Sequence, residues 1–170
     1  MEKVFQGVRF DVSAIDLPGS DGQLHRREVV QHPGAVVILP LLTDAQVVLI
    51  RNRRHAVEQT LLELPAGTLE AGEDPADCAS REVVEETGYK AKKITRLTDF
   101  YTSPGICTER MWAFLATDLT HVGQDLDASE QITVEVMPLD QSMQMIESGE
   151  IRDGKTIATL LYYRQFVEKS

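Results

Sequence analysis

Cysteines are scarce in this sequence, and long apolar runs are missing. Its 170 residues contain two cysteines, Cys78 and Cys107, which are too few for a disulfide scaffold, so we expect buried, reduced thiols. No segment reaches the roughly 18 to 20 apolar residues that span a bilayer, and no basic head precedes an apolar stretch. We therefore expect a soluble, cytoplasmic protein without a membrane partner.

Basic residues are in the minority. The chain has 17 Lys and Arg against 27 Asp and Glu, which gives a formal net charge of -10. A field of this sign repels polyanions and offers no basic surface for a nucleic acid. We expect no nucleic-acid partner, and an anionic substrate must be small or bound by a local group of charges.

The chain length favours one compact domain, and the first residues favour an arm in front of it. Residues 3–15 and 23–30 alternate loosely as extended segments, and the turn residues of 17–22 (LPGSDG) separate them. This pattern predicts a two-stranded N-terminal arm over residues 1–32 and a single domain over residues 33–170.

The rest of the chain mixes strands and helices, which predicts a layered α/β fold. Apolar, β-branched segments predict two strands that form a central hairpin, at 35–42 and 45–54. Four more strands are expected, at 60–67, 94–102, 110–119 and 131–139.

Three helices are expected, at 74–87, 139–148 and 156–168. The first has clear boundary signals, because Asp74 suits the N-cap, Pro75 the first helical position and Gly88 a left-handed end. Asp140 is available to cap the second helix.

Glutamates gather on one face of the helix expected at 74–87. Positions three and four apart share a helix face, so Glu82, Glu85 and Glu86 present their carboxylates together. Each like-charged pair costs a few tenths of a kcal/mol, roughly, whereas a divalent cation makes the cluster favourable. Oxygen ligands of this kind suit Mg²⁺ or Mn²⁺. Arg81, four residues before Glu85, is placed to orient one carboxylate.

A solvated acidic helix face is the simpler explanation of such a charge run. It does not explain the surroundings, because Gly67 and Gly72 bracket a loop that must bend back onto the helix. It also leaves unexplained a small apolar face opposite the charges, formed by Ala76, Ala79, Val83 and Val84. We expect a backbone carbonyl of the loop to face the same cation.

The stretch from Gly67 to Tyr89 resembles the Nudix box. That motif is a glycine, five residues, a glutamate, seven residues, Arg-Glu, an apolar residue, any residue, Glu-Glu, any residue, a glycine and an apolar residue. Nine constrained positions over 23 residues are met here, by Gly67, Glu73, Arg81, Glu82, Val83, Glu85, Glu86, Gly88 and Tyr89. Tyr89 is a mild departure, because an aliphatic residue is commoner there.

This resemblance implies a Nudix fold, an α/β/α sandwich around a mixed β-sheet, and hydrolysis of a nucleoside diphosphate linked to another group. It implies that Glu82, Glu85, Glu86 and the Ala66 carbonyl hold Mg²⁺ or Mn²⁺, with Glu85 and Arg81 in catalytic roles. Water is the expected nucleophile, and the cations neutralise charge on the phosphate oxygens.

Features outside the box resemble the ADP-ribose pyrophosphatases and related nucleoside-diphosphate-sugar hydrolases. Pro104 follows Tyr89 by fifteen residues, as in that subfamily, although an ordinary Pro-Gly turn is the alternative. Arg54 and the Glu63 region look like the subfamily's substrate-binding strands, where Arg54 would bind a phosphate through two hydrogen bonds. A solvated strand end is the alternative for Arg54.

The arm has a counterpart in the resembling enzymes, where an N-terminal sheet crosses to the partner subunit of a homodimer and helps to hold the nucleoside. The resemblance implies Phe10 as a stacking platform and Arg27 or Glu28 as polar contacts. An aromatic residue on a strand is nevertheless more often part of a core.

The resemblance also implies a catalytic base on the loop that here reads GQDLDASEQITVEV, where Glu130 aligns best. The subfamily often has a second glutamate two residues earlier, at the position of Ala128. Glu130 can therefore be base, metal ligand or both, with Asp127 as the fallback, and a surface carboxylate is the alternative.

Together these features predict a metal-dependent pyrophosphatase that cleaves ADP-ribose to AMP and ribose 5-phosphate, with other nucleoside-diphosphate sugars as further substrates. GDP-mannose or a similar compound as the main substrate is one alternative. A triphosphate-cleaving enzyme or an RNA 5'-pyrophosphohydrolase gives the arm and Pro104 no role. The alternative of another class is a catalytically silent, nucleotide-sensing Nudix module.

Overall fold

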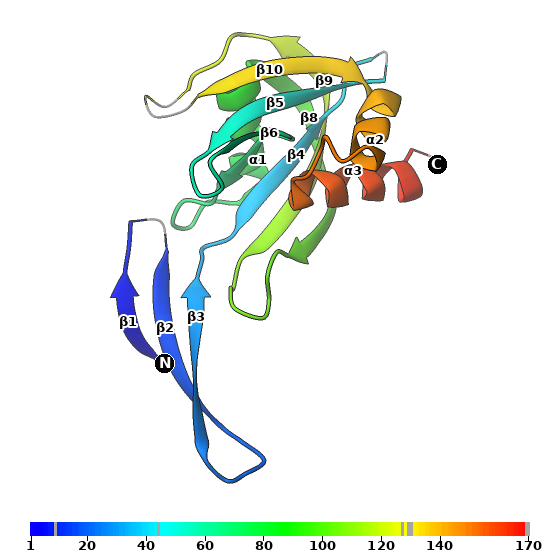
Figure 1. Ribbon diagram of the computed structural model, residues 1–170. Coiled ribbons are helices and arrows are strands. Elements are labelled where there is room, and N and C mark those ends of the chain that lie inside the picture. The colour runs from blue at the N-terminus through cyan, green and yellow to red at the C-terminus, as the bar shows by residue number, and fades with distance from the viewer. Residues whose placement is uncertain (9, 44, 127, 129–130, 169–170) are drawn as a thin grey trace.

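The computed structural model of the protein describes residues 1–8, 10–43, 45–126, 128 and 131–168. A narrow N-terminal arm projects from a larger body of strands and helices (Figure 1). Among the described helices, none has the length and apolar character needed to cross a membrane.

The arm is a three-stranded antiparallel sheet of β1 (Glu2–Gln6), β2 (Asp11–Pro18) and β3 (Leu24–Gln31). The expectation of two strands was therefore wrong, because the first extended segment reverses direction after Gln6. At this reversal the Gly7 amide donates a hydrogen bond to the Phe10 carbonyl at 3.1 Å. A Cβ on Gly7 would lie 2.6 Å from that carbonyl oxygen, so the glycine permits a turn that the alternating pattern concealed.

The body contains two sheets that face each other (Figure 1). The mixed sheet has four strands in the order β7 (Ala66–Thr68), β4 (Ala35–Pro40), β9 (Arg110–His121) and β8 (Tyr89–Tyr101), with β4 and β9 parallel. The second sheet is antiparallel, in the order β10 (Ile132–Pro138), β5 (Gln46–Arg54) and β6 (Gln59–Glu63).

The predicted central hairpin of residues 35–42 and 45–54 was wrong, because β4 and β5 belong to different sheets. A single bridge between Leu41 and Val47 joins them before they separate. All of β4 is buried, so it needs cover on both faces, and the facing sheet provides one of these covers. The strand predicted at 60–67 likewise divides into β6 and β7 around Leu64 and Pro65, since Pro65 has no amide to donate to a ladder.

The helices occur where they were expected: α1 (Pro75–Thr87), α2 (Leu139–Glu147) and α3 (Gly154–Phe166). Asp74 caps α1 by accepting from the Ala76 amide at 2.8 Å. Asp140 does not cap α2, because it lies in the first turn and pairs with Arg164 of α3. Helix α3 begins two residues earlier than expected, because Asp153 caps it by accepting from the Thr156 amide.

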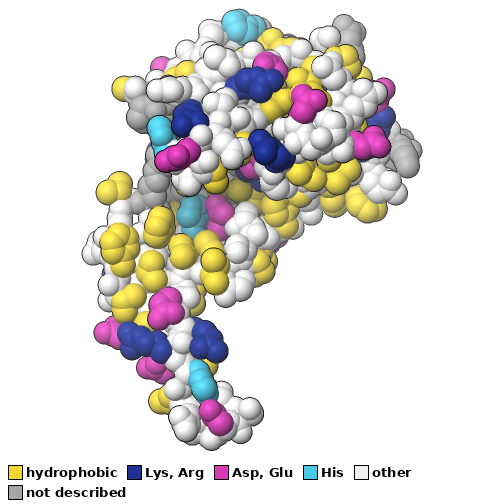
Figure 2. Space-filling model, in the orientation of Figure 1, with side chains coloured by type: hydrophobic (Ala, Val, Ile, Leu, Met, Phe, Trp, Pro, Cys, Tyr) yellow, Lys and Arg dark blue, Asp and Glu magenta, His cyan; other side chains and the backbone are white. Residues whose placement is uncertain are grey.

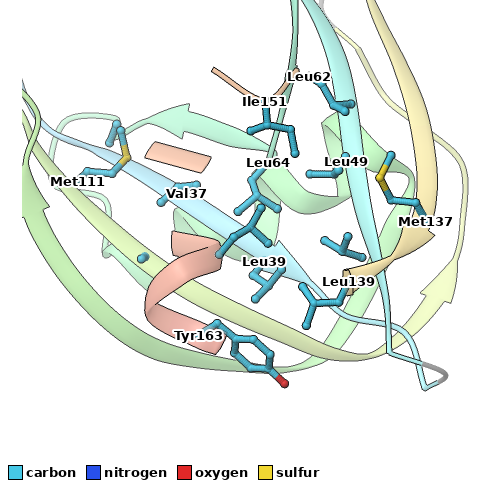
Figure 3. Close-up of a cluster of buried hydrophobic side chains, with 14 residues drawn as sticks. Val37, Leu39, Leu49, Leu62, Leu64, Met111, Met137, Leu139, Ile151 and Tyr163 are labelled. Carbon is cyan, nitrogen blue, oxygen red and sulfur yellow. The ribbon is translucent and has the colours of Figure 1, made fainter. Parts of the chain in front are cut away.

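Strand β4 has a hydrophobic cluster on each side, which produces the expected α/β/α layers. Val37 and Leu39 face the second sheet and α3, in the cluster of Figure 3 that also contains Leu49, Leu64 and Tyr163. Val36 and Ile38 face α1, in a second cluster formed with Cys78, Ala79, Val83, Phe114 and Ala116. The small apolar face of α1 therefore packs on the mixed sheet and leaves the helix's carboxylates on its other sides.

Helix α1 ends against the chain that leaves β9. Gly88 adopts the left-handed conformation (φ 74°), and its amide donates to the Val84 carbonyl. A Cβ at this position would lie 2.8 Å from the carbonyl carbon of Gly123 and 2.9 Å from the Gln124 nitrogen. The glycine is thus required twice, by its backbone conformation and by the close approach of residues 123–124.

We predict that Gly88→Ala destabilises the protein more than Gly149→Ala. Gly149 also has a positive φ (78°), but a Cβ there would meet nothing within 4 Å. The left-handed conformation alone should cost roughly 1–2 kcal/mol, and the backbone collision at Gly88 should add about 1–3 kcal/mol. Urea unfolding of both variants measures the difference, and equal losses would show that the contact with residues 123–124 is not as close as described.

Candidate functional site

Two glutamates of helix α1 lie against the backbone of strand β7. The Ala66 amide donates to Oε2 of Glu86 at 2.8 Å, and Glu86 is buried. A Cβ on Gly67 would lie 1.8 Å from the carboxylate carbon of Glu82. Only a glycine leaves room for Glu82, so Ala66 and Gly67 form a cradle for the carboxylates.

Arg81 connects this cradle to the preceding loop. Its Nε and Nη2 donate to the two oxygens of Glu73, each at 3.1 Å. Its Nη1 donates to Glu82 at 2.8 Å and to Glu85 at 2.9 Å. One guanidinium thus orients carboxylates from the loop and from two positions of the helix.

Protonation in this cluster follows from the same contacts. Hydrogen bonds from Arg81 lower the pKa of Glu73 from 4.5 to about 2, and Glu73 in turn raises the pKa of Arg81. Burial, followed by the negative charge of Glu73, raises the pKa of the Cys78 thiol from 9.0 to about 12. Cys78 therefore stays a neutral thiol and is not a nucleophile at neutral pH.

The donor set fits a hard divalent cation. Carboxylate oxygens of Glu82 and Glu86 and the backbone of Ala66 meet at the Gly67 cradle, and oxygen is the ligand that Mg²⁺ and Mn²⁺ prefer. Over the described part of the chain, no three acidic, His or Cys side chains already stand in a coordinating arrangement. The positive charge that balances Glu82 and Glu85 is that of Arg81. A bound cation would supply positive charge to the same two carboxylates.

A cleft of about 490 Å³ opens onto the cradle. Its wall includes Ala66 and Gly67 of β7, the ends of β5 and β6, both ends of the loop between β8 and β9, and the start of α3. Residues of both sheets line it, so the cleft lies where the two sheets meet. It is large enough for part of a nucleotide-sized ligand next to the carboxylates.

One wall of the cleft is an ionic network around Glu63, which is fully buried. Arg54 donates to its two oxygens at 2.9 and 2.6 Å, and this bond raises the pKa of Arg54. Lys155 also pairs with Glu63 and lies 2.9 Å from Asp153. Two cations and two carboxylates thus satisfy one another, as a buried charge requires.

A family model described as the NUDIX domain matches residues 31–160 of the sequence. The chain belongs to the Nudix family. This match confirms the resemblance expected from the box. The expected fold class is confirmed by a solved structure, "Crystal structure of ADP compounds hydrolase", which superposes on this chain with a TM-score of 0.85. That match has 25% sequence identity and covers 99% of this chain and 91% of the other.

Individual Nudix relatives have different names. An ADP-ribose pyrophosphatase of Bacillus subtilis (strain 168) is 39% identical, over 95% of this chain and 88% of that protein. A methanol dehydrogenase activator of Bacillus methanolicus is 36% identical, over 95% of this chain and 88% of that protein. A GDP-mannose pyrophosphatase of Escherichia coli O1:K1 is 36% identical, over 86% of this chain and 83% of that protein.

The predicted substrate residues of this Nudix protein occupy different places. Arg54 and Glu63 both line the cleft, although the two Arg54 nitrogens expected to bind phosphate are bonded to Glu63. Pro104 lies in the exposed loop between β8 and β9, and the ends of that loop, Thr102 and Glu109, line the cleft. Pro104 is therefore near the site without being part of the described wall.

The arm residues lie apart from the cleft of their own chain. Phe10 is 44% exposed, and its ring centroid is 6.3 Å from that of Phe5. Arg27 and Glu28 are exposed on β3. None of the three is among the described residues that line the cleft. Glu130 and Asp127, the expected base and its fallback, lie outside the described residues.

Some of the residues that line the cleft were not predicted from the sequence, namely Thr102, Glu109, Asp153 and Lys155. A signal for Lys155 was present, because Glu63 lies between Leu62 and Leu64 in an apolar strand. A carboxylate buried in this way requires a cationic partner. The sequence alone could not show that the partner comes from residues 92 positions later, at the start of α3.

We predict that Glu73→Gln lowers stability at neutral pH and has little effect near pH 2. The folded pKa of Glu73 (about 2) is below its ordinary value of 4.5, so its ion pair is complete above about pH 4.5. The contribution is lost as the pH falls toward 2. Urea unfolding is measured at pH 7, 5, 4 and 3. The difference in the free energy of unfolding between wild type and Glu73→Gln should shrink as the pH falls, whereas the difference for the exposed Glu70→Gln should show no such trend. A constant gap would contradict the prediction.

Proposed function

We propose that this chain hydrolyses the pyrophosphate of ADP-ribose to AMP and ribose 5-phosphate and accepts other nucleoside-diphosphate sugars. The observation that carries the proposal is the cleft, whose wall contains Arg54 and Lys155 and also Ala66 and Gly67. Ala66 bonds to Glu86, and Gly67 lies against Glu82, so the cleft reaches the backbone that holds two of the Nudix glutamates. The names of the relatives support it, since two are pyrophosphatases of ADP-ribose and GDP-mannose. In the reaction, water adds to one phosphorus, and the bridging oxygen leaves with the other.

The glutamates of α1 hold the metal in this proposal. The residues that would hold Mg²⁺, or Mn²⁺ in its place, are Glu82, Glu85, Glu86 and, through its carbonyl, Ala66. A cation held there would neutralise phosphate charge and favour activation of a water molecule. In this proposal Glu130 is the base, a metal ligand or both, and Arg81 keeps the helix and loop aligned through Glu73.

The wall around Glu63 supplies positive charge to an otherwise acidic protein. Arg54 and Lys155 reach the cleft while Glu63 fixes both side chains. Because these cations are held in place before the ligand arrives, they lose little freedom on binding a phosphate. A small anion is thus favoured locally despite the net charge of -10.

Two other functions remain as alternatives. GDP-mannose as the main substrate is supported by the 36% identical relative of that name. A catalytically silent, nucleotide-sensing module has less support, because all the glutamates of the Nudix box are present.

We predict that the purified chain with Mg²⁺ releases AMP and ribose 5-phosphate from ADP-ribose, with a higher kcat/KM than for GDP-mannose or UDP-glucose. Glu85→Gln should lower kcat by about 10²- to 10³-fold, and the exposed loop variant Glu70→Gln should not. Product release is measured by chromatography. Absence of product from all three compounds would refute the proposal, and a preference for GDP-mannose would select that alternative.

We also propose a homodimer, in which the arm over residues 1–32 crosses to the partner and the domain over residues 33–170 carries the chemistry. Figure 2 shows hydrophobic side chains gathered on the arm. The exposed large apolar residues of the arm include Val4, Phe5, Phe10, Leu17 and Leu24. A three-stranded sheet with so much exposed apolar surface needs a partner to cover it. Phe10, Arg27 and Glu28 would then reach the partner's nucleoside.

We place the protein in the cytoplasm. Cys78 and Cys107 are free thiols, which suits a reducing compartment. A nucleotide substrate formed inside cells agrees with this placement.

We predict that Phe5→Lys with Phe10→Lys converts a dimer into a monomer, because two charges would be buried in the apolar contact. Sedimentation velocity measures the change. The control is Gln141→Lys with Gln144→Lys, which adds the same charge on exposed positions of α2 and should leave the dimer intact. A wild-type monomer at all concentrations would contradict the dimer.

A further inference from the structure

The end of helix α1 carries two of the Nudix glutamates, and it is held from outside the helix. The last carbonyls of a helix have no partner within it. Here the Asp125 amide donates to the Glu85 carbonyl at 3.1 Å, and the side-chain amide of Gln124 donates to the Glu86 carbonyl at 2.6 Å. The segment that follows β9 thus bonds to the turn that presents both carboxylates.

Glu86 is fixed at both ends by these contacts. Its side chain accepts from the Ala66 amide, and its backbone carbonyl accepts from Gln124. Among the described residues, the other bonds from this segment to the helix end come from backbone amides: Asp125 donates to the Glu85 carbonyl, and Val122 and Gly123 donate to the Gly88 carbonyl at 2.7 and 3.2 Å. Gln124 is therefore the point at which a side chain, and hence a substitution, can alter this attachment.

We propose that Gln124 is a positioning residue for the metal site of helix α1, an inference that rests on the proposed metal-dependent function. Helix ends fray when their carbonyls are left to solvent. Ligands of a metal must be held to within about 0.5 Å, a precision that depends on the groups behind them. Gln124 supplies that support by holding the final turn, so that Glu85 and Glu86 keep their places beside Ala66 and Gly67.

The side-chain chemistry of Gln124 suits this role, and the described contacts show no other role for it. Its side-chain amide is a neutral donor, and a carbonyl can only accept. The residue is exposed, so its side chain is not needed to fill the core.

The test compares Gln124→Met with Gln144→Met in the full chain. Methionine has a similar length and charge but cannot donate, and Gln144 is an exposed glutamine on α2. MgCl₂ is titrated while thermal unfolding is followed, and Mg²⁺ binding is measured directly by calorimetry. We expect the apparent Kd for Mg²⁺ to rise about tenfold in Gln124→Met and to stay unchanged in Gln144→Met. If Gln124→Met does not fold, Gln124→Asn, which keeps the amide but shortens its reach, should show a smaller rise.

The outcomes separate this inference from the proposed function. A purely structural role for Gln124 would lower Tm equally without Mg²⁺ and at saturating Mg²⁺, with the same apparent Kd as wild type. That result overturns the inference and leaves the proposed hydrolysis intact. A wild-type protein that does not respond to Mg²⁺ overturns both.

Discussion

The site depends on the ion pairs of Arg81. Helix α1 places glutamates so close together that they would repel one another, and the guanidinium lies between Glu82 and Glu85. The same group is bonded through two nitrogens to Glu73, which belongs to the loop rather than the helix. Arg81 thus neutralises charge and also ties together two segments of chain. Without this tie, the loop after β7 would be free to move away from the carboxylates that it supports.

The fold brings a second set of charges to the same place. Because β4 and β5 enter different sheets, the end of β5 faces β7 across a cleft instead of forming a hairpin with β4. The start of α3 completes the enclosure and contributes Lys155. Carboxylates on one side and fixed cations on the other form a site with two kinds of binding group. This pairing of charges is what the proposed diphosphate substrate and its metal would require.

Much of the site was predictable because its residues lie within one short motif. Spacing along α1 fixed the face shared by Glu82, Glu85 and Glu86, and the capping signals at Asp74 and Gly88 fixed the ends of the helix. Contacts between distant segments were not predictable in this way. The partner of Glu63 comes from α3, and the sheet to which β5 belongs is decided by burial across the whole domain.

Two smaller predictions were wrong because short-range patterns do not show what the folded chain places nearby. The arm was assigned two strands because alternation continued through Gly7, and nothing in that pattern shows that a chain reverses there. Asp140 was a plausible cap, but Arg164, 24 residues away, competes for its carboxylate. A side chain that could cap its own helix can instead pair with a residue that only the folded chain brings close.

Pro65 has a consequence for how firmly the two sides of the site are joined. It separates β6 from β7, so that Glu63 belongs to one sheet and Ala66 to the other. Only two residues intervene, and the Pro65 carbonyl is itself bonded to the Ile38 amide at 2.9 Å. Glu63, which bonds to Arg54 and Lys155, is therefore joined to the carboxylate cradle at Ala66 by a short covalent link as well as by packing. The cation-bearing wall and the cradle cannot move far apart unless the bonds to Glu63 break.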